Sequence, residues 1–473
     1  MGIADIAVLA AIAAGNWFLK TLPRRGIPLY GADSWIMLCW ARKFREKAPK
    51  SEFSDHLVHN ERHDYPDLFP KMLSFLDDKA ALKFNSIIPV FFDLCNLLIV
   101  FGISYYVFRE TFPAAVSGVV YSLFPPLLTQ HACLNSRFPG YLFVNLSIGL
   151  LIIGRAEGVL PATIAGIAAG GLVLNTHRFS AQAFFAALAG MSVFEGTWYY
   201  ALALAGSILA AIAFSGGFYL IVLSGHAKII RLHYTKFRTT PYEKIRFKGS
   251  MLKTVLWGSM LLIGVFGADM AGAHIPGMYV STVNWAVSLF AAFILTTFII
   301  YLHPFGQGYR YLEYCIMPLS VLFGSAVAIR GPLWPVAAGL FAVYAAVSAR
   351  KISVHAREIR ADYENIVDKD RLRIFEIIKK SGIRNILCVP NALAQSAAYF
   401  TGKKVLWTYN AWERYPWMFP KITMPLKFEL AEVIKEHDID AVLLHEKFAA
   451  RGDLKARTEL IAAEGRYLLL RLI

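Results

Sequence analysis

Long apolar runs separated by short polar breaks follow one another from residue 3 to residue 348. About 20 apolar residues suffice to cross the hydrocarbon core of a bilayer as an α-helix. The pattern therefore predicts a polytopic α-helical membrane protein with about eleven transmembrane helices. The expected spans cover residues 3–19, 86–108, 113–134, 141–153, 159–174, 181–194, 197–224, 251–272, 279–302, 311–329 and 333–348.

The first apolar run, residues 3–19, lacks the basic start and the small-residue cleavage site of a signal peptide. We expect it to be an uncleaved first helix. Glycine or proline interrupts several later runs, and each interruption marks either an ordinary kink or a bend around a cavity. The interrupting residues are Pro125, Pro126, Gly216, Gly217 and Pro318.

The pattern changes at Arg350, where charges become frequent and short β-branched runs alternate with helical ones. We therefore divide the chain into a transmembrane domain, 1–349, and a small soluble α/β domain, 350–473, with a mostly parallel sheet. The second domain lacks GxGxxG and a P-loop, so a structural or acceptor-positioning role is favoured over nucleotide binding. The predicted strands are 385–389, 403–407, 441–444 and 467–472, and the predicted helices are 370–380, 393–400, 426–437 and 453–463.

The composition agrees with a membrane protein. Hydrophobic residues make up 56% of the chain, charged residues only 17%, and the mean hydropathy is +0.47, which excludes an ordinary soluble enzyme. The net charge of +15 suits loops that face anionic lipid headgroups, so nucleic acid need not be a partner. The five cysteines lie far apart without a CxxC pair, which indicates packing residues rather than disulfides or a zinc site.

A polar segment between the first two spans, residues 20–85, is too long for a simple hairpin loop. Residues 35–47 alternate apolar and basic side chains at helical spacing, which predicts either a helix in the headgroup plane or a plain amphipathic surface helix. Asp33 comes immediately before this pattern. Its carboxylate is either a functional group at the membrane mouth or an N-cap for a helix starting at Ser34.

Further along the same segment, ionisable residues are concentrated in a stretch that two prolines close, residues 62–70. The predicted candidates for substrate contacts here are His63, Asp64 and Tyr65. His63 and Asp64 could orient a sugar or help to bind a divalent ion, although two adjacent residues do not form a metal site by themselves. A purely structural turn is the alternative.

Arginines at the ends of spans form a second group of candidates. Arg310 stands between aromatic residues at a helix entrance, close to Tyr311 and Glu313, and its planar guanidinium suits a phosphate at headgroup level. Arg137 and Arg178 are weaker candidates of the same kind. Snorkelling to lipid phosphate is the alternative for all three arginines. Carboxylates expected to be structural are Asp93, Glu195 and Asp269.

The orientation predicted from these features contains a conflict. An odd number of spans with a cytoplasmic N-terminus places both the segment 20–85 and the C-terminal domain outside. The loop 226–248 is strongly basic, and the positive-inside tendency places it in the cytoplasm. Either a segment near Ala181 is re-entrant or split, or this loop is an exception.

Three short motifs now make a resemblance visible. Gly-Ala-Asp-Ser at 31–34, Asp-Tyr-Pro-Asp-Leu-Phe at 64–69, and Tyr-Arg-Tyr-Leu-Glu at 309–313 with Pro318 beyond it resemble motifs of the GT-C class of multi-helix glycosyltransferases. In that class the second motif often reads Tyr-Pro-Pro-Leu-Phe, and here Asp67 replaces the second proline. A C-terminal soluble α/β domain also fits the class.

The resemblance implies an enzyme that transfers a hexosyl or pentosyl group from a polyprenyl-phosphate carrier to a glycan, lipid or protein acceptor. Asp33 would be the general base of an inverting reaction, and Arg310 would hold the carrier phosphate, with Arg137 and Arg178 as further candidates. The active site and the C-terminal domain would lie on the extracytoplasmic side of the plasma (inner) membrane. No metal ligands are assigned, because Ala32 and Ser34 flank Asp33 and no two-Asp motif results, but a divalent metal stays possible.

Two other classes of protein compete with this interpretation. A lipid-linked sugar transporter or flippase would show internal repeats and charges near the membrane midplane, and no clear repeat is present. A non-catalytic membrane scaffold would bind a partner through its soluble domain and would have no need of Asp33 together with Arg310.

Overall fold

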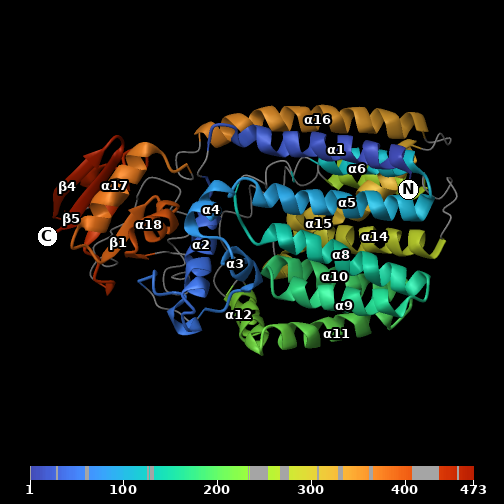
Figure 1. Cartoon of the computed structure of the whole chain (residues 1–473), viewed down its shortest axis with the longest axis horizontal. Helices are drawn as coiled ribbons and strands as arrows, with labels where there is room; N and C mark the ends of the chain where they lie inside the picture. Colours follow the sequence, from blue (N-terminus) through green and yellow to red (C-terminus); the bar gives the residue numbers. More distant parts are fainter. Residues whose placement is uncertain are drawn as a thin grey trace.

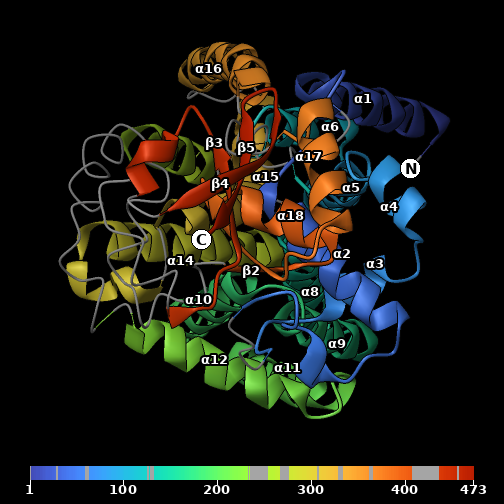
Figure 2. The same ribbon diagram turned by 90° about the vertical axis from the view of Figure 1, so that its left-hand side faces the viewer.

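The computed structural model has a bundle of long helices, a small α/β domain at one end, and a layer of short helices between the two (Figure 1). Viewed from the end that carries the sheet, the α/β domain lies in front of the bundle (Figure 2). The described residues are 2–27, 30–58, 63–124, 127, 133–232, 234, 254–266, 276–305, 308–328, 334–361, 366–406, 436–454 and 457–473.

A helix lies in each of the eleven predicted spans. Six of the described helices are long and apolar enough to cross a membrane, and the bent pair α11 and α12 would add a seventh, so the number of complete spans stays a prediction. The helices are α1 (Ile3–Thr21), α5 (Ile88–Phe108), α6 (Thr111–Ser122), α8 (Arg137–Ala156), α9 (Leu160–Leu174), α10 (Arg178–Phe194), α11 (Tyr199–Phe214), Thr254–Phe266, α14 (Pro276–Phe298), α15 (Gly308–Ala328) and α16 (Trp334–Ala361).

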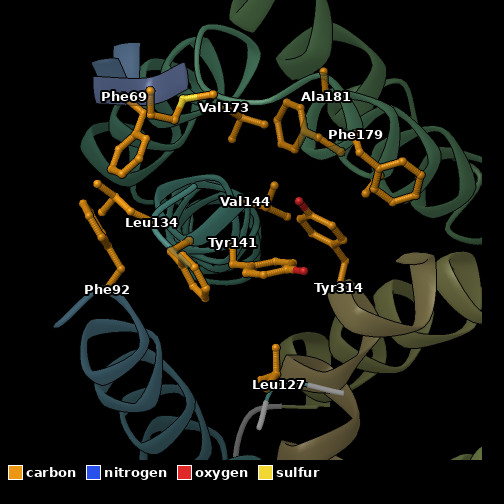
Figure 3. Close-up of a cluster of buried hydrophobic side chains, with 14 of the residues drawn as sticks. Phe69, Phe92, Leu127, Leu134, Tyr141, Val144, Val173, Phe179, Ala181 and Tyr314 are labelled. Carbon is orange, nitrogen blue, oxygen red and sulfur yellow. The ribbon is translucent and has the colours of Figure 1, made fainter. Parts of the chain in front are cut away.

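The bundle has a centre and a periphery. We compared the buried share of the most apolar 18-residue window in each span. This share is 94% in α15, but only 11% in the span that begins with α1 and 17% in α16. α15 therefore is the central helix, whereas α1 and α16 lie together at one edge (Figure 1). The apolar core continues around α8, where aromatic and aliphatic side chains from several helices meet (Figure 3).

The predicted span 197–224 is wrong as a single helix. The chain forms α11 and then α12 (Phe218–Leu232), which are bent by 117° relative to each other. Gly216 and Gly217 have φ of +58° and +86°, a left-handed conformation that ends α11, and the Ser215 hydroxyl accepts from the Tyr219 N–H at 2.9 Å. As a result, α12 leaves the bundle and lies across its end (Figure 1).

The polar segment 20–85 folds into the layer between the bundle and the α/β domain. Its amphipathic part forms α2, and the apolar face of α2 packs on helix α18 of the C-terminal domain, with Trp35 only 5.1 Å from the Phe400 ring. Trp35 is fully buried, so α2 is not a plain surface helix, and its position in the headgroup plane stays a prediction. The elements of the layer are η1 (Leu22–Arg24), α2 (Ala32–Arg45), η2 (Lys50–Glu52), α3 (Leu68–Leu73) and α4 (Asp78–Lys83), and η4 (Ile300–Phe305) links α14 to α15.

The C-terminal domain has a five-stranded sheet in the order β2-β1-β3-β5-β4. β2, β1 and β3 are parallel, but β5 is antiparallel to β3 and β4 to β5, so the sheet is mixed rather than mostly parallel. The elements are α17 (Lys369–Lys380), β1 (Asn385–Val389), α18 (Leu393–Thr401), β2 (Lys404–Leu406), β3 (Ala441–His445), η5 (Arg451–Leu454), β4 (Thr458–Glu464) and β5 (Tyr467–Leu472).

The predicted helix 453–463 is also wrong, because most of this segment forms strand β4. Gly465 at φ +57° turns the chain back, and β4 then pairs with β5 along its length. Backbone pairing in this hairpin outweighs the helical propensity of the alanines and glutamates. Most of the predicted helix 426–437, and Trp407 at the end of a predicted strand, lie outside the described residues.

Candidate functional site

Asp33 lies in the first turn of α2, at the junction between the bundle and the short-helix layer. The helix begins at Ala32 with Gly31 as its N-cap, so the predicted role of Asp33 as an N-cap is wrong. Gly31 has φ +99°, and a Cβ there would come within 2.1 Å of the Cys133 Cβ. Only glycine therefore fits, and the Asp33 side chain is left exposed rather than occupied as a cap.

Ser34 ties this turn to the segment that leads into α8. Its buried hydroxyl accepts from the Leu134 N–H at 2.9 Å and donates to the Tyr30 carbonyl at 3.1 Å. Because Leu134 lies three residues before α8, Asp33 is held within electrostatic reach of Arg137, the first residue of that helix. The main chain of residues 30–34 and the Ser34 hydroxyl thus hold the Asp33 carboxylate in position.

Three predicted arginines meet at this end of the bundle. Arg137 and Arg178 are the first residues of α8 and α10, and Arg310 is the third residue of α15. The ring of His177, the N-cap of α10, is within electrostatic reach of all three guanidinium groups. Helix N-termini carry a partial positive charge of about half a unit, so the three cations and three dipoles favour an anion here.

The arginines differ in their partners. Arg178 forms an ion pair with the Asp64 carboxylate and donates to the Asp64 carbonyl at 2.7 Å. Arg310 lies over the Phe179 ring at 5.6 Å, is half-buried, and has a buried Nε without a hydrogen-bond partner. Within the described part of the chain, no carboxylate pairs with Arg310. Arg178 is thus neutralised by the protein, whereas Arg310 has no counter-charge in this part of the structure.

Glu313 and Tyr311 form the buried wall behind Arg310. Glu313 is 2% exposed and accepts from the Tyr141 hydroxyl at 2.6 Å, and it is also within electrostatic reach of Arg137. The Tyr311 hydroxyl donates to a main-chain carbonyl at 2.8 Å. Tyr141 and Tyr314 extend toward each other between α8 and α15 (Figure 3). The Tyr141–Glu313 bond thus joins α8 to α15, and the Tyr314 hydroxyl, 2.5 Å from the Ser180 hydroxyl, joins α15 to α10.

The loop with His63, Asp64 and Tyr65 forms another wall. The His63 ring is 4% exposed, packs edge-on against Trp40 at 4.7 Å and stacks on Phe218 at 5.8 Å. Burial, followed by the charges of nearby cations, lowers the pKa of His63 to about 3, so this ring is neutral at ordinary pH. The Tyr65 hydroxyl lies 2.9 Å from the Ser136 hydroxyl, which ties the loop to the start of α8.

The departure of Asp67 from the motif of the GT-C class has a structural counterpart. Asp67 forms an ion pair with Lys50, whose ammonium also lies over the rings of Phe44 at 4.1 Å and Phe218 at 4.6 Å. Burial lowers the pKa of Lys50, and the carboxylate offsets part of that effect. Asp67 therefore fastens the loop to the turn after α2.

The sequence did not point to Ser34, His177 or His226 as parts of the site. His226 reaches the site only because α12 bends across the bundle end, where it is within electrostatic reach of His177 and Arg178. No local pattern signals this position. His177 directly precedes Arg178, and its place before an apolar run could have marked it as an N-cap.

The remaining predicted residues fall elsewhere. Asp93 belongs to a buried network inside the bundle, and Glu195 pairs with Arg155 at the opposite end. All five cysteines are free. No cluster of three or more residues suited to a metal ion occurs among the described residues. Asp269, and most of the basic loop 226–248, lie outside those residues.

The comparisons with known proteins bear on the fold. No protein-family model matches the sequence, and no curated protein matches it. ArnT from Cupriavidus metallidurans in its apo state aligns over 99% of this chain and 98% of its own, with a TM-score of 0.63 at 9% identity. The same protein bound to undecaprenyl phosphate aligns over 100% and 99%, with a TM-score of 0.61 at 10% identity.

An oligosaccharyltransferase from Archaeoglobus fulgidus, tethered to an acceptor peptide, aligns over 93% of this chain and 69% of its own, with a TM-score of 0.58 at 12% identity. These proteins are GT-C glycosyltransferases, and the alignments include both the bundle and the C-terminal domain. The expected fold is confirmed: the chain is a polytopic helical membrane protein with a GT-C-like fold.

Proposed function

We propose that the protein is a membrane glycosyltransferase that takes a sugar from a polyprenyl-phosphate carrier, with Asp33 as its general base. One observation carries the proposal. An exposed carboxylate lies within electrostatic reach of Arg137 at the same bundle end as Arg310, a guanidinium with no carboxylate partner among the described residues. The fold adds support, because a neighbour with this fold has been solved with undecaprenyl phosphate bound.

In the proposed reaction, Asp33 accepts the proton of an acceptor hydroxyl as its oxygen attacks the anomeric carbon of the sugar. The bond between that carbon and the carrier phosphate oxygen breaks, and the configuration at the carbon inverts. The products are the glycosylated acceptor and the free polyprenyl phosphate. Positioned proton transfer of this kind typically accelerates a reaction by about 10²- to 10⁴-fold.

Negative charge develops on the leaving phosphate, and the arginines are placed to stabilise it. Arg310 can donate several N–H groups from one plane, and its buried Nε has no other use in the described structure. The N-termini of α8, α10 and α15 add their dipoles to the same region. In a partly dry site, fixed donors of this type stabilise developing charge more effectively than water does.

Arg137 links the two halves of the proposed site. It is within electrostatic reach of both Glu313 of α15 and Asp33. Asp64 and Tyr65 would contact the sugar or the acceptor, with Arg178 holding Asp64 in place. We propose that the His63 ring, packed between aromatic side chains, forms one wall of the sugar site. Tyr311 and Glu313 would lie next to the bound phosphate.

The proposed location is the extracytoplasmic face of the plasma (inner) membrane. The first loop and the C-terminal domain share one side, because α2 packs on α18 and Leu57 bridges to Val405 of β2. This contact agrees with the odd number of spans expected from the sequence. The transporter alternative is disfavoured, because the candidate site residues gather at one end of the bundle rather than at the midplane.

Replacement of the proposed base tests the function. Purified protein in nanodiscs is given undecaprenyl-phosphate monosaccharides together with acceptors extracted from membranes, and released undecaprenyl phosphate is measured. Asp33→Asn should slow release by about 100-fold or more, because the acceptor proton then has no base. The control is Glu46→Gln, an exposed carboxyl at the other end of α2, which should react at the wild-type rate. Full activity of Asp33→Asn would contradict the proposal.

A further inference from the structure

The imidazole of His177 stands at the start of α10 and is fixed there along one edge. Its Nδ1 accepts from the Ser180 N–H at 3.3 Å, which makes His177 the N-cap of the helix. The Ser180 hydroxyl also lies 3.3 Å from Nδ1 and 2.5 Å from the Tyr314 hydroxyl, and Ser180 and Tyr314 are both buried. The ring is thus held by α10 itself and, through Ser180, by α15.

These contacts decide which nitrogen of the ring carries the proton. A backbone N–H can only donate, so Nδ1 is the unprotonated acceptor. Burial, followed by the positive charges of Arg137 and Arg310, lowers the pKa of His177, so the ring is neutral at ordinary pH. A neutral imidazole has a single N–H, and in His177 that donor is therefore Nε2.

The Nε2–H group is open to a ligand. Within the described residues only Nδ1 of this ring is hydrogen-bonded, and Nε2 is not one of the enclosed polar atoms that lack a partner. The residue as a whole is 9% exposed, so a nearly buried ring keeps one accessible donor. That donor belongs to the bundle end where Arg137, Arg178 and Arg310 are all within electrostatic reach of His177.

The surroundings favour a phosphate rather than a sugar hydroxyl as the acceptor. Three guanidinium groups and the N-terminus of α10 all attract negative charge, and a hydrogen bond to a charged acceptor is stronger than one to a neutral hydroxyl. A neutral ring also fits this position well, because it donates to the anion without adding a fourth positive charge to the cluster.

We propose that His177 donates its Nε2–H to the phosphate of the polyprenyl carrier, with Ser180 and Tyr314 as the positioning residues that hold the ring. The inference rests on the proposed transferase function and gives the reaction a further catalytic residue. When the bond from the anomeric carbon to the phosphate oxygen breaks, its electron pair stays on that oxygen, and the hydrogen bond strengthens as the negative charge grows. Nε2 keeps its proton throughout, so His177 is a hydrogen-bond donor and not a general acid.

Two amide substitutions separate the donor from the N-cap. His177→Asn keeps a favourable N-cap, but its shorter side chain does not reach the position of Nε2. His177→Gln places an amide N–H near that position and gives up the favourable cap. Titration of the full-length protein in nanodiscs with undecaprenyl phosphate should show a Kd weakened about tenfold or more in His177→Asn, because a hydrogen bond to a charged group is lost. His177→Gln should bind within about threefold of the wild type.

The reverse order would indicate that only the cap matters and would overturn the inference. Wild-type affinity in folded His177→Asn, or an equal loss in both variants, would overturn it as well. The matched control is Asp368→Asn, which exchanges the N-cap of α17 in the C-terminal domain and should bind like the wild type. In the transfer assay, His177→Asn should lower kcat by about 100-fold and change KM much less, whereas a structural role would not give this division.

The titration requires no sugar transfer, so the two proposals can fail separately. Full activity of Asp33→Asn together with the expected Kd values would remove the proposed base and keep the His177 contact. Loss of activity in Asp33→Asn together with unchanged Kd values would remove the His177 contact alone.

Nuclear magnetic resonance of the ¹⁵N-histidine-labelled wild type provides a second measurement if His177→Asn misfolds. The His177 signals are identified by their absence in His177→Gln. Nε2 should carry the proton, and its resonance should shift when undecaprenyl phosphate is added. A proton on Nδ1, or an Nε2 resonance that does not move, would overturn the inference.

Discussion

Two clusters of charge in this protein, both built around an aspartate, differ in whether the protein itself satisfies them. Inside the bundle, Asp93 accepts from Asn16 at 2.7 Å and Tyr121 at 2.8 Å and lies 3.9 Å from the Lys20 ammonium, with both charged side chains at most 2% exposed. At the bundle end, Asp33 is exposed. A charged group with internal partners holds the fold together, whereas an accessible one is available for a substrate.

The same contrast separates the arginines at the bundle end. Arg178 has Asp64 as a partner, and Arg310 has no carboxylate partner in the described part of the chain. Two arginines in the first turns of neighbouring helices thus have different expected roles. The comparison teaches that the partners of a side chain, more than its type or its place on a helix, indicate chemistry.

The most direct test of this comparison is the binding of undecaprenyl phosphate. Arg310→Gln should weaken its Kd by about 10- to 100-fold, because a charge-assisted hydrogen bond of about 1.5–3 kcal/mol is lost. Arg178→Gln should weaken it less, since Asp64 already neutralises that guanidinium. Titration of both purified variants measures the difference, and an equal loss in both would break the distinction between the two arginines.

The next effect concerns stability in the interior cluster. Asp93→Asn should lower the free energy of unfolding by about 3–5 kcal/mol, because Lys20 is then a buried cation without a counter-charge. The double change Lys20→Met with Asp93→Leu should recover most of that loss. Denaturant unfolding in detergent measures both variants. The folded protein of each variant should transfer sugar at the wild-type rate. A loss of activity in folded protein would indicate that the Asp93 cluster contributes to the site.

The smallest expected effect is a pH dependence of stability. His63 has a folded pKa of about 3 against an ordinary value near 6.5, so it stays neutral when folded and gains a proton when unfolded. Its contribution to stability is complete above about pH 6.5 and declines as the pH falls toward 3. At pH 5 the loss should be about 2 kcal/mol relative to pH 7. Thermal unfolding should show this loss in the wild type and a smaller one in His63→Phe, while an equal loss in both would assign it to other groups.

Much of the architecture could be predicted from the sequence because hydrophobic periodicity is a local property. Each expected span contains a helix, and the four predicted strands fall on β1, β2, β3 and β5. The errors occur where distant contacts outweigh local preference. β4 is a strand because β5 lies beside it, and α2 is buried because α18 covers its apolar face.

The candidate site divides in the same way. The residue pattern alone pointed to Asp33, to the arginines at helix ends and to a membrane fold, since motif, charge and apolar length are all properties of short stretches of chain. It could not reveal that Asp64 neutralises Arg178 or that His226 belongs to the site. Nor could it reveal that Gly31, not Asp33, is the N-cap of α2. Those features depend on contacts between residues as many as 114 positions apart in the chain, and only the packing of α2, α8, α10, α12 and α15 at one end of the bundle creates them.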